Sequence, residues 1–181
     1  MSAALGSLQG FEVAPGVAAA PRWPEPDEAW VGVGSNLGDR AATIAAAVAA
    51  LPGVLCVSPL VETEPWGIVD QPWFLNGVVQ LRWDGSPRDL LERCLAIERD
   101  LGRVRALRNG PRAIDLDVLI AGCSRVTDSD LQVPHPGIAS RRSVLEPWAA
   151  VAPELVVPGL GRTLEELRRE AAGLPRQAVR G

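Results

Sequence analysis

The stretch GRVRALRNGPRAIDLDVLIAG, residues 102–122, carries the pattern that decides the fold of this chain. In its second half, apolar residues alternate with Asp115 and Asp117. Alternation at every second position is typical of a half-buried β-strand, whose successive side chains point to opposite faces. We therefore predict a strand over residues 115–120, with both carboxylates on the same face.

Two carboxylates side by side on a strand lie roughly 6.6 Å apart and repel each other unless a cation lies between them. A divalent ion such as Mg²⁺ would neutralise them, because it binds carboxylate oxygens and leaves positions for phosphate. Four arginines belong to the same stretch: Arg103, Arg105, Arg108 and Arg112. Their forked, permanently charged groups suit phosphate oxygens. The stretch therefore predicts a metal–phosphate site, although an acidic pair on a strand is often only a solvated edge.

The composition limits the class of protein. With 181 residues, 47% of them hydrophobic and 22% charged, the chain has the size and balance of one soluble domain. Its net charge of −4 argues against a general binder of nucleic acids or anionic membranes. All 18 basic residues other than histidine are arginine, which excludes a catalytic lysine. Unpaired cysteines and the lack of a secretory signal or membrane-length apolar run predict a cytoplasmic protein.

The chain divides into a tail and one domain. Residues 1–28 are rich in alanine, glycine and proline, and we expect an extended or disordered tail there and a single domain over 29–181. Periodicity predicts elements in the order strand, helix, strand, strand, helix, strand. Their expected ranges are 30–34, 40–51, 54–64, 74–82, 86–101 and 115–120. This order predicts an α+β fold with a mainly antiparallel sheet and helices on one face.

Several polar residues near the ends of these elements have more than one interpretation. Asn36 and Asp39 are alternative caps for the first helix. Beyond the last strand we expect a short helix and a final one from Thr163, which begins a Thr-x-x-Glu capping box. His135 lies between two prolines close to the Arg141–Arg142 pair. A lone histidine is often structural, but this basic locus is also compatible with phosphate binding.

Four segments, taken in order, resemble the 6-hydroxymethyl-7,8-dihydropterin pyrophosphokinase family of folate biosynthesis. They are VGVGSNLGDR, ETEPWGIVDQPWFLN, IERDLGRVRALRNGPRAIDLDVLIAG and VPHPGIASRR. Each segment is a weak signal alone, whereas their ordered combination is highly specific. The resemblance implies a ferredoxin-like βαββαβ core in a three-layer αβα arrangement with C-terminal helical additions. It also implies transfer of pyrophosphate from ATP to the pterin hydroxymethyl group, leaving AMP.

The resemblance further implies a role for individual residues. Asp115 and Asp117 would hold two Mg²⁺ ions on the phosphates of ATP, and Arg103 and Arg112 would be the catalytic residues. The ATP-binding residues would be Glu98, Arg103, Arg112, His135 and Arg141. The pterin-binding residues would be Thr63, Trp66, Phe74 and Asn76. The partners would be these small molecules, without nucleic acid or membrane, and a monomer is expected.

Two alternatives stay open on the sequence. Versions of the family motif carry an aromatic residue where this chain has Ser143, and often a tryptophan where it has Asn109. Ser143 therefore leaves open a catalytically weakened homologue that binds pterin or nucleotide without turnover. The βαββαβ order is also that of RNA-recognition domains, which present aromatic residues on a basic sheet face. The negative net charge and the two aspartates on the last strand disfavour that alternative.

Overall fold

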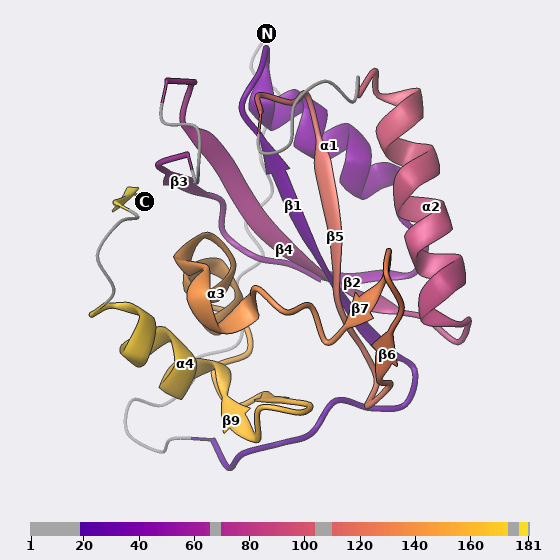
Figure 1. Cartoon of the computed structure of the whole chain (residues 1–181), viewed down its shortest axis with the longest axis vertical. Coiled ribbons are helices and arrows are strands. Elements are labelled where there is room, and N and C mark those ends of the chain that lie inside the picture. The colour runs from indigo at the N-terminus through magenta and orange to yellow at the C-terminus, as the bar shows by residue number, and fades with distance from the viewer. Residues whose placement is uncertain (1–18, 66–69, 104–109, 174–177, 181) are drawn as a thin grey trace, which may run out of the picture.

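A six-stranded sheet lies between two layers of helices in the computed structural model, which describes residues 19–65, 70–103, 110–173 and 178–180 (Figure 1). The strands of this sheet are β1 (Glu28–Ser35), β2 (Val54–Val57), β3 (Val61–Thr63), β4 (Phe74–Arg82), β5 (Asp115–Ala121) and β10 (Val179–Arg180). The helices are α1 (Arg40–Ala50), α2 (Pro87–Asp100), α3 (Arg142–Ala149) and α4 (Leu164–Ala171). The expected α+β, three-layer αβα fold is confirmed.

The topology places β1 at the centre of the site-bearing half of the sheet. The strand order is β10–β3–β4–β1–β5, β2 also pairs with β4, and every pairing in the sheet is antiparallel. In this register Gly34 of β1 lies opposite Asn76 of β4 on one side and Asp115 of β5 on the other. Gly32 lies opposite Asp117. Asn76, which is expected to bind the pterin, and Asp115, which is expected to bind metal, therefore lie on the two sides of a single strand, β1.

The smaller elements follow β5. They are β6 (Val126–Thr127), β7 (Gln132–Val133), a 3-10 turn (Ile138–Ser140), β8 (Val156–Val157) and β9 (Arg162–Thr163). β6 pairs with β7 and β8 pairs with β9, each as a two-stranded antiparallel ribbon. The loop from β7 to α3 carries His135 and leads to Arg141, so it brings the second basic locus back to the sheet.

The sequence predicts one strand over 54–64, whereas the structure has β2 and β3 in its place. Pro59 lies in the interruption and has no N–H group to donate to β4. Ser58 pairs there instead, because its backbone N–H donates to the carbonyl of Val78 at 2.9 Å and its Oγ accepts from the Val78 N–H at 2.9 Å. After the break β3 resumes the pairing with β4, and its Thr63 is buried.

Both faces of the sheet bury a hydrophobic core. One core packs the sheet against α1 and α2, and it includes Val31, Ile44 and Leu90. The other packs it against α3 and α4, where Trp30 of β1 meets Trp148 of α3 with ring centroids 5.5 Å apart. The capping box expected at Thr163 is present. Among the described residues no helix has the length and hydropathy of a membrane span.

The segment before β1 contacts the domain. The guanidinium group of Arg22 pairs with Glu28 and with Glu154, and its backbone bridges to Leu155. Residues 1–18 lie outside the described residues. The expected extended or disordered tail therefore stays a prediction for them.

Candidate active site

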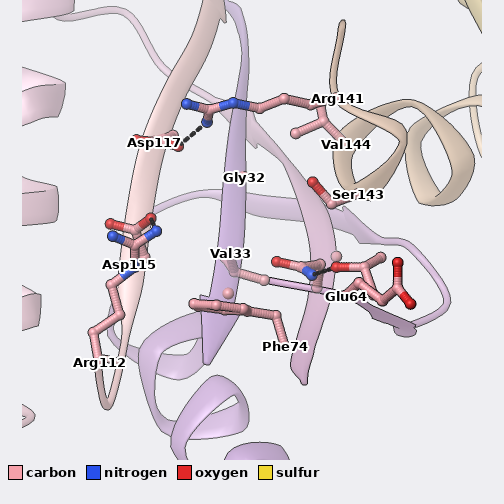
Figure 2. A pocket seen from close by; sticks show the side chains of 14 residues that line it. Gly32, Val33, Glu64, Phe74, Arg112, Asp115, Asp117, Arg141, Ser143 and Val144 are labelled. Atoms are coloured by element: carbon pink, nitrogen blue, oxygen red, sulfur yellow. Dashed lines mark hydrogen bonds and ion pairs between the residues drawn. The ribbon is translucent and has the colours of Figure 1, made fainter. Parts of the chain in front are cut away.

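Residues from four strands and from the start of α3 line one pocket. Figure 2 shows Asp115 and Asp117 of β5 on one side of it, Glu64 on the other, and the Phe74 ring near β1. Seven residues expected from the sequence lie on this pocket: Thr63, Phe74, Asn76, Arg112, Asp115, Asp117 and Arg141. Ser143 and Val144, at the start of α3, also line it. Trp66, the remaining residue expected at the pterin site, lies outside the described residues.

The two aspartates face the pocket and are held by arginines. Asp115 pairs with Arg103 Nη1 at 2.5 Å and with Arg112 Nη2 at 3.0 Å. Asp117 pairs with Arg141 Nη1 at 2.9 Å. The side chain of Asp115 is 18% exposed and that of Asp117 is 33% exposed, so both are partly shielded from solvent. The alternation in the sequence thus located an acidic pair that is enclosed by cationic groups.

The electrostatics of the pair favour a bound cation. Burial raises the pKa of Asp115, the charge of Asp117 raises it further, and Arg112 and Arg103 act in the opposite direction. Two carboxylates on one face fit Mg²⁺, which proteins hold with one or two carboxylates while substrate phosphates and water complete the shell. In the described part of the chain, no cluster of three or more His, Cys, Asp or Glu side chains could hold a metal without such help.

Glu98 lies behind the pocket rather than on it. Its side chain is 3% exposed, and its Oε1 accepts the backbone N–H of Leu116 at 2.7 Å and a hydrogen bond from Arg103. Burial raises the pKa of this carboxyl, and its bonds to Leu116 and Arg103 oppose the rise. Glu98 therefore supports Arg103 and the start of β5, and its direct contact with a nucleotide stays a prediction.

His135 lines a second pocket, which meets the first at Asp117. The other walls of this second pocket include the apolar side chains of Leu91, Leu116, Val118, Leu131 and Pro136. His135 Nδ1 accepts the backbone N–H of Gly137 at 3.0 Å, so in the neutral ring the proton is on Nε2. Burial lowers the pKa of His135, which keeps the ring neutral. Its Nε2–H is therefore a hydrogen-bond donor.

The pterin-binding candidates are arranged around Gly34. Asn76 Nδ2 donates to Thr63 Oγ1 at 2.8 Å, which fixes the direction of the amide. A side-chain carbon at Gly34 would lie 2.7 Å from Asn76 Oδ1, so only glycine leaves room for this amide. The guanidinium carbon of Arg112 lies 5.3 Å from the ring centroid of Phe74, within cation–π range. Arg112 thus contacts both the ring of Phe74 and the carboxylate of Asp115.

Asn36 connects the two halves of the site, and sequence reasoning did not assign it this place. Its side chain is buried, Nδ2 donates to Gln71 Oε1 and to the Pro72 carbonyl at 3.0 Å each, and Oδ1 accepts the Arg112 N–H at 2.8 Å. The cap of α1 is instead Asp39, which accepts the Ala42 N–H at 3.0 Å. The only sequence signal is a polar residue that directly follows a fully buried strand.

The chain is similar to known proteins over most of its length. A family model described as 7,8-dihydro-6-hydroxymethylpterin-pyrophosphokinase (HPPK) matches residues 30–153. The chain is 48% identical over 136 residues to 2-amino-4-hydroxy-6-hydroxymethyldihydropteridine pyrophosphokinase of Methylorubrum extorquens, which spans 72% of this chain and 86% of that protein. It is 45% identical over 143 residues to the protein of the same name from Pseudomonas aeruginosa, across 76% of this chain and 88% of that one.

The fold is also similar to that of solved structures. A crystal structure of Plasmodium falciparum HPPK-DHPS superposes with a TM-score of 0.63 and 15% sequence identity. The match covers 81% of this chain and 43% of that chain, so this chain spans less than half of the fusion protein. At this level of identity the likeness supports the fold alone.

Proposed function

Since the chain belongs to the 7,8-dihydro-6-hydroxymethylpterin-pyrophosphokinase family, whose members are pyrophosphokinases of folate biosynthesis, we propose that it transfers pyrophosphate from ATP to 6-hydroxymethyl-7,8-dihydropterin. The hydroxymethyl oxygen attacks the β-phosphorus of ATP, and the bond from that phosphorus to the oxygen bridging it to the α-phosphate breaks. AMP leaves with the bridging oxygen, the hydroxyl proton is lost, and the pterin carries the diphosphate.

We propose that the first pocket holds the pterin at the end next to Phe74 and Asn76. An aromatic ring and a fixed amide suit a flat heterocycle with hydrogen-bonding edges. Thr63 supports this arrangement because its hydroxyl accepts from Asn76 and so orients the amide. Trp66 stays a proposed member of the same site.

The phosphates are proposed to lie at the other end, beside Asp115 and Asp117. These carboxylates would hold two Mg²⁺ ions, which would neutralise phosphate charge and favour displacement at phosphorus. Arg103, Arg112 and Arg141 would bind phosphate oxygens. The second pocket adjoins Asp117 and combines apolar side chains with polar ones such as Gln132 and His135, so it is suited to the base of the nucleotide.

The observation that carries this proposal is the acidic pair with its arginines in the pocket that also holds Asn76 and Phe74. The test is incubation of the protein with ATP, Mg²⁺ and hydroxymethyl dihydropterin, with AMP and pterin diphosphate measured by chromatography. Formation of both products in equal amounts, and its loss when EDTA is added, is expected. Binding of both substrates without AMP would instead support the weakened homologue suggested by Ser143.

The RNA-binding alternative has less support in the structure. An RNA-recognition sheet offers one open face with aromatic side chains for stacking. In the described residues, α1 and α2 pack against one face of this sheet and α3 and α4 against the other. Filter binding to RNA at low and high salt tests this alternative directly.

His135 is expected to act as a donor and not as a base. Glutamine can place an N–H near the position of the imidazole Nε2–H, so His135→Gln should retain more activity than His135→Ala. Loss of one charge-assisted hydrogen bond costs about 1.5–3 kcal/mol, which predicts a fall in kcat/KM of roughly 10–150-fold for alanine. Because burial lowers the pKa of His135, the wild-type profile of kcat/KM should show no inflection from this ring between pH 6.5 and 8. An equal loss in both variants would contradict the donor role.

Asn36→Asp separates the two functions of the Asn36 amide. Aspartate keeps an oxygen for the Arg112 N–H but loses the donors to Gln71 and Pro72. We expect KM for the pterin to rise roughly 5–150-fold, since each of the two lost hydrogen bonds contributes about 0.5–1.5 kcal/mol and each ~1.4 kcal/mol is a factor of ten. The matched control is Asp39→Ala at the α1 cap, which should lower stability by about 1 kcal/mol and leave KM unchanged. Steady-state kinetics and thermal melts distinguish the two, and equal KM values for both variants would contradict this coupling.

A further inference from the structure

Guanidinium groups form ion pairs with the two carboxylates that the proposed function assigns to the metal ions. Arg141 bonds Asp117 at 2.9 Å, and Arg112 bonds Asp115 at 3.0 Å. Arg103 uses one nitrogen, Nη1, to bond both Asp115 and the buried Glu98. The arginines that would bind phosphate are thus the same groups that hold the metal ligands in the free protein.

The formal charges of this cluster cancel. Asp115, Asp117 and Glu98 contribute three negative charges, and the three arginines contribute three positive ones. A divalent cation that arrives alone must therefore displace a guanidinium group and leave a net positive cluster. A triphosphate that arrives alone has to approach arginines whose charge is already balanced. A nucleotide tetra-anion with two divalent cations is neutral as a whole, so it alone leaves the charge balance unchanged.

We propose that Arg141, Arg112 and Arg103 act as exchangeable counter-ions, which pair with the two aspartates in the free protein and transfer to phosphate oxygens when a nucleotide binds. This inference rests on the proposed function, because that function assigns the metal and the phosphates to these groups. Divalent cation and nucleotide then bind as one coupled unit, and the cation alone binds weakly. The arginines thereby determine the order in which the ligands of the site assemble.

Two features of the arginines suit such an exchange. The side chain of Arg141 is 32% exposed and reaches the pocket from the loop before α3, so it can move without disturbing the sheet. The buried Nε of Arg112 has no hydrogen-bond partner among the described residues. A buried donor without a partner is costly, and an incoming phosphate oxygen would satisfy it.

The experiment measures binding of Mn²⁺, a hard divalent ion with an electron paramagnetic resonance signal, to the free protein without nucleotide. Removing the competing group in Arg141→Ala should tighten Mn²⁺ binding up to about fivefold, because a partly exposed ion pair contributes about 0.2–1 kcal/mol. The same substitution in an Asp117→Asn background should have no effect. Arg162→Ala removes an equal charge from an exposed pair with Glu166 and Glu170 and should match the wild type. A nonhydrolysable ATP analogue should tighten Mn²⁺ binding to the wild type, and Arg141→Ala should reduce that gain.

Equal Mn²⁺ affinity in the wild type and in Arg141→Ala, or no Mn²⁺ binding by either, would overturn the inference. Circular dichroism verifies that the variant is folded, and Arg141→Met replaces it should alanine destabilise the start of α3. The measurement needs no turnover. Normal AMP formation with equal Mn²⁺ affinities would refute the exchange alone, whereas absence of AMP formation together with tighter Mn²⁺ binding by Arg141→Ala would refute the proposed turnover alone.

Discussion

Asp117→Ala is expected to abolish AMP formation while the protein stays folded. A metal ion stabilises transition-state charge by several kcal/mol and each ~1.4 kcal/mol is a factor of ten, so kcat should fall by roughly 10³-fold or more. Stability should change little, because Asp117 is one-third exposed and its pair with Arg141 is reached by solvent. The measurements are kcat at saturating ATP and pterin and a thermal melt of each protein.

Asp115→Ala is the companion variant, and its expected loss of kcat is similar. Asp128→Ala is the matched control, because Asp128 also pairs with an arginine, Arg88 at 2.7 Å, but does not line either pocket. That control should retain wild-type kcat. Near-normal turnover in both Asp115→Ala and Asp117→Ala would refute the assignment of these carboxylates to the metal.

The fold was predictable where local chemistry and periodicity agree. The alternation around Asp115 and Asp117 located β5, and the Thr-x-x-Glu box located the start of α4. The interruption between β2 and β3 was missed although Pro59 is a local signal for it, whereas the pairing of Ser58 with Val78, twenty residues away, is not visible in any local pattern. Nor does the sequence predict β10, where Val179 pairs with Thr63. Such pairings depend on the assembled sheet edge and not on any local pattern.

The residues of the site likewise fall into those that the sequence predicts and those that only the tertiary structure reveals. The two carboxylates are visible in the sequence because aspartates inside an apolar alternation are unusual, and the arginines are visible as a cluster just before it. Asn36 was not predicted as a connecting residue, because its partners Gln71 and Arg112 are brought to it only by tertiary structure. The position of Glu98 behind Arg103 also follows from α2 packing against β5, since residue type alone does not distinguish a buried support from a ligand contact.

Arg112→Ala should slow the reaction without unfolding the protein. Arg112 contacts Asp115 through Nη2 and lies over the Phe74 ring, at the junction of the two proposed ligands. Removing one preorganised donor to developing charge typically costs 10²–10³ in rate, so we expect a fall in kcat of roughly that size. Single-turnover kinetics with excess enzyme measure the chemical step. An unchanged rate would contradict the proposed phosphate role of Arg112.

The pH profiles of two Arg112 variants distinguish the effect of the positive charge from the effect of the guanidinium geometry. The Arg112 charge lowers the pKa of Asp115 against the opposing effects of burial and Asp117. In Arg112→Ala that pKa should rise, so Asp115 takes up a proton at higher pH, and the acidic limb of log kcat/KM, which reports the free protein, moves to higher pH. Arg112→Lys keeps the charge and should hold the limb in place, yet it lacks the forked donors and should still lose rate. A limb that moves equally in both variants would show that the guanidinium geometry, and not its charge, controls the protonation of Asp115.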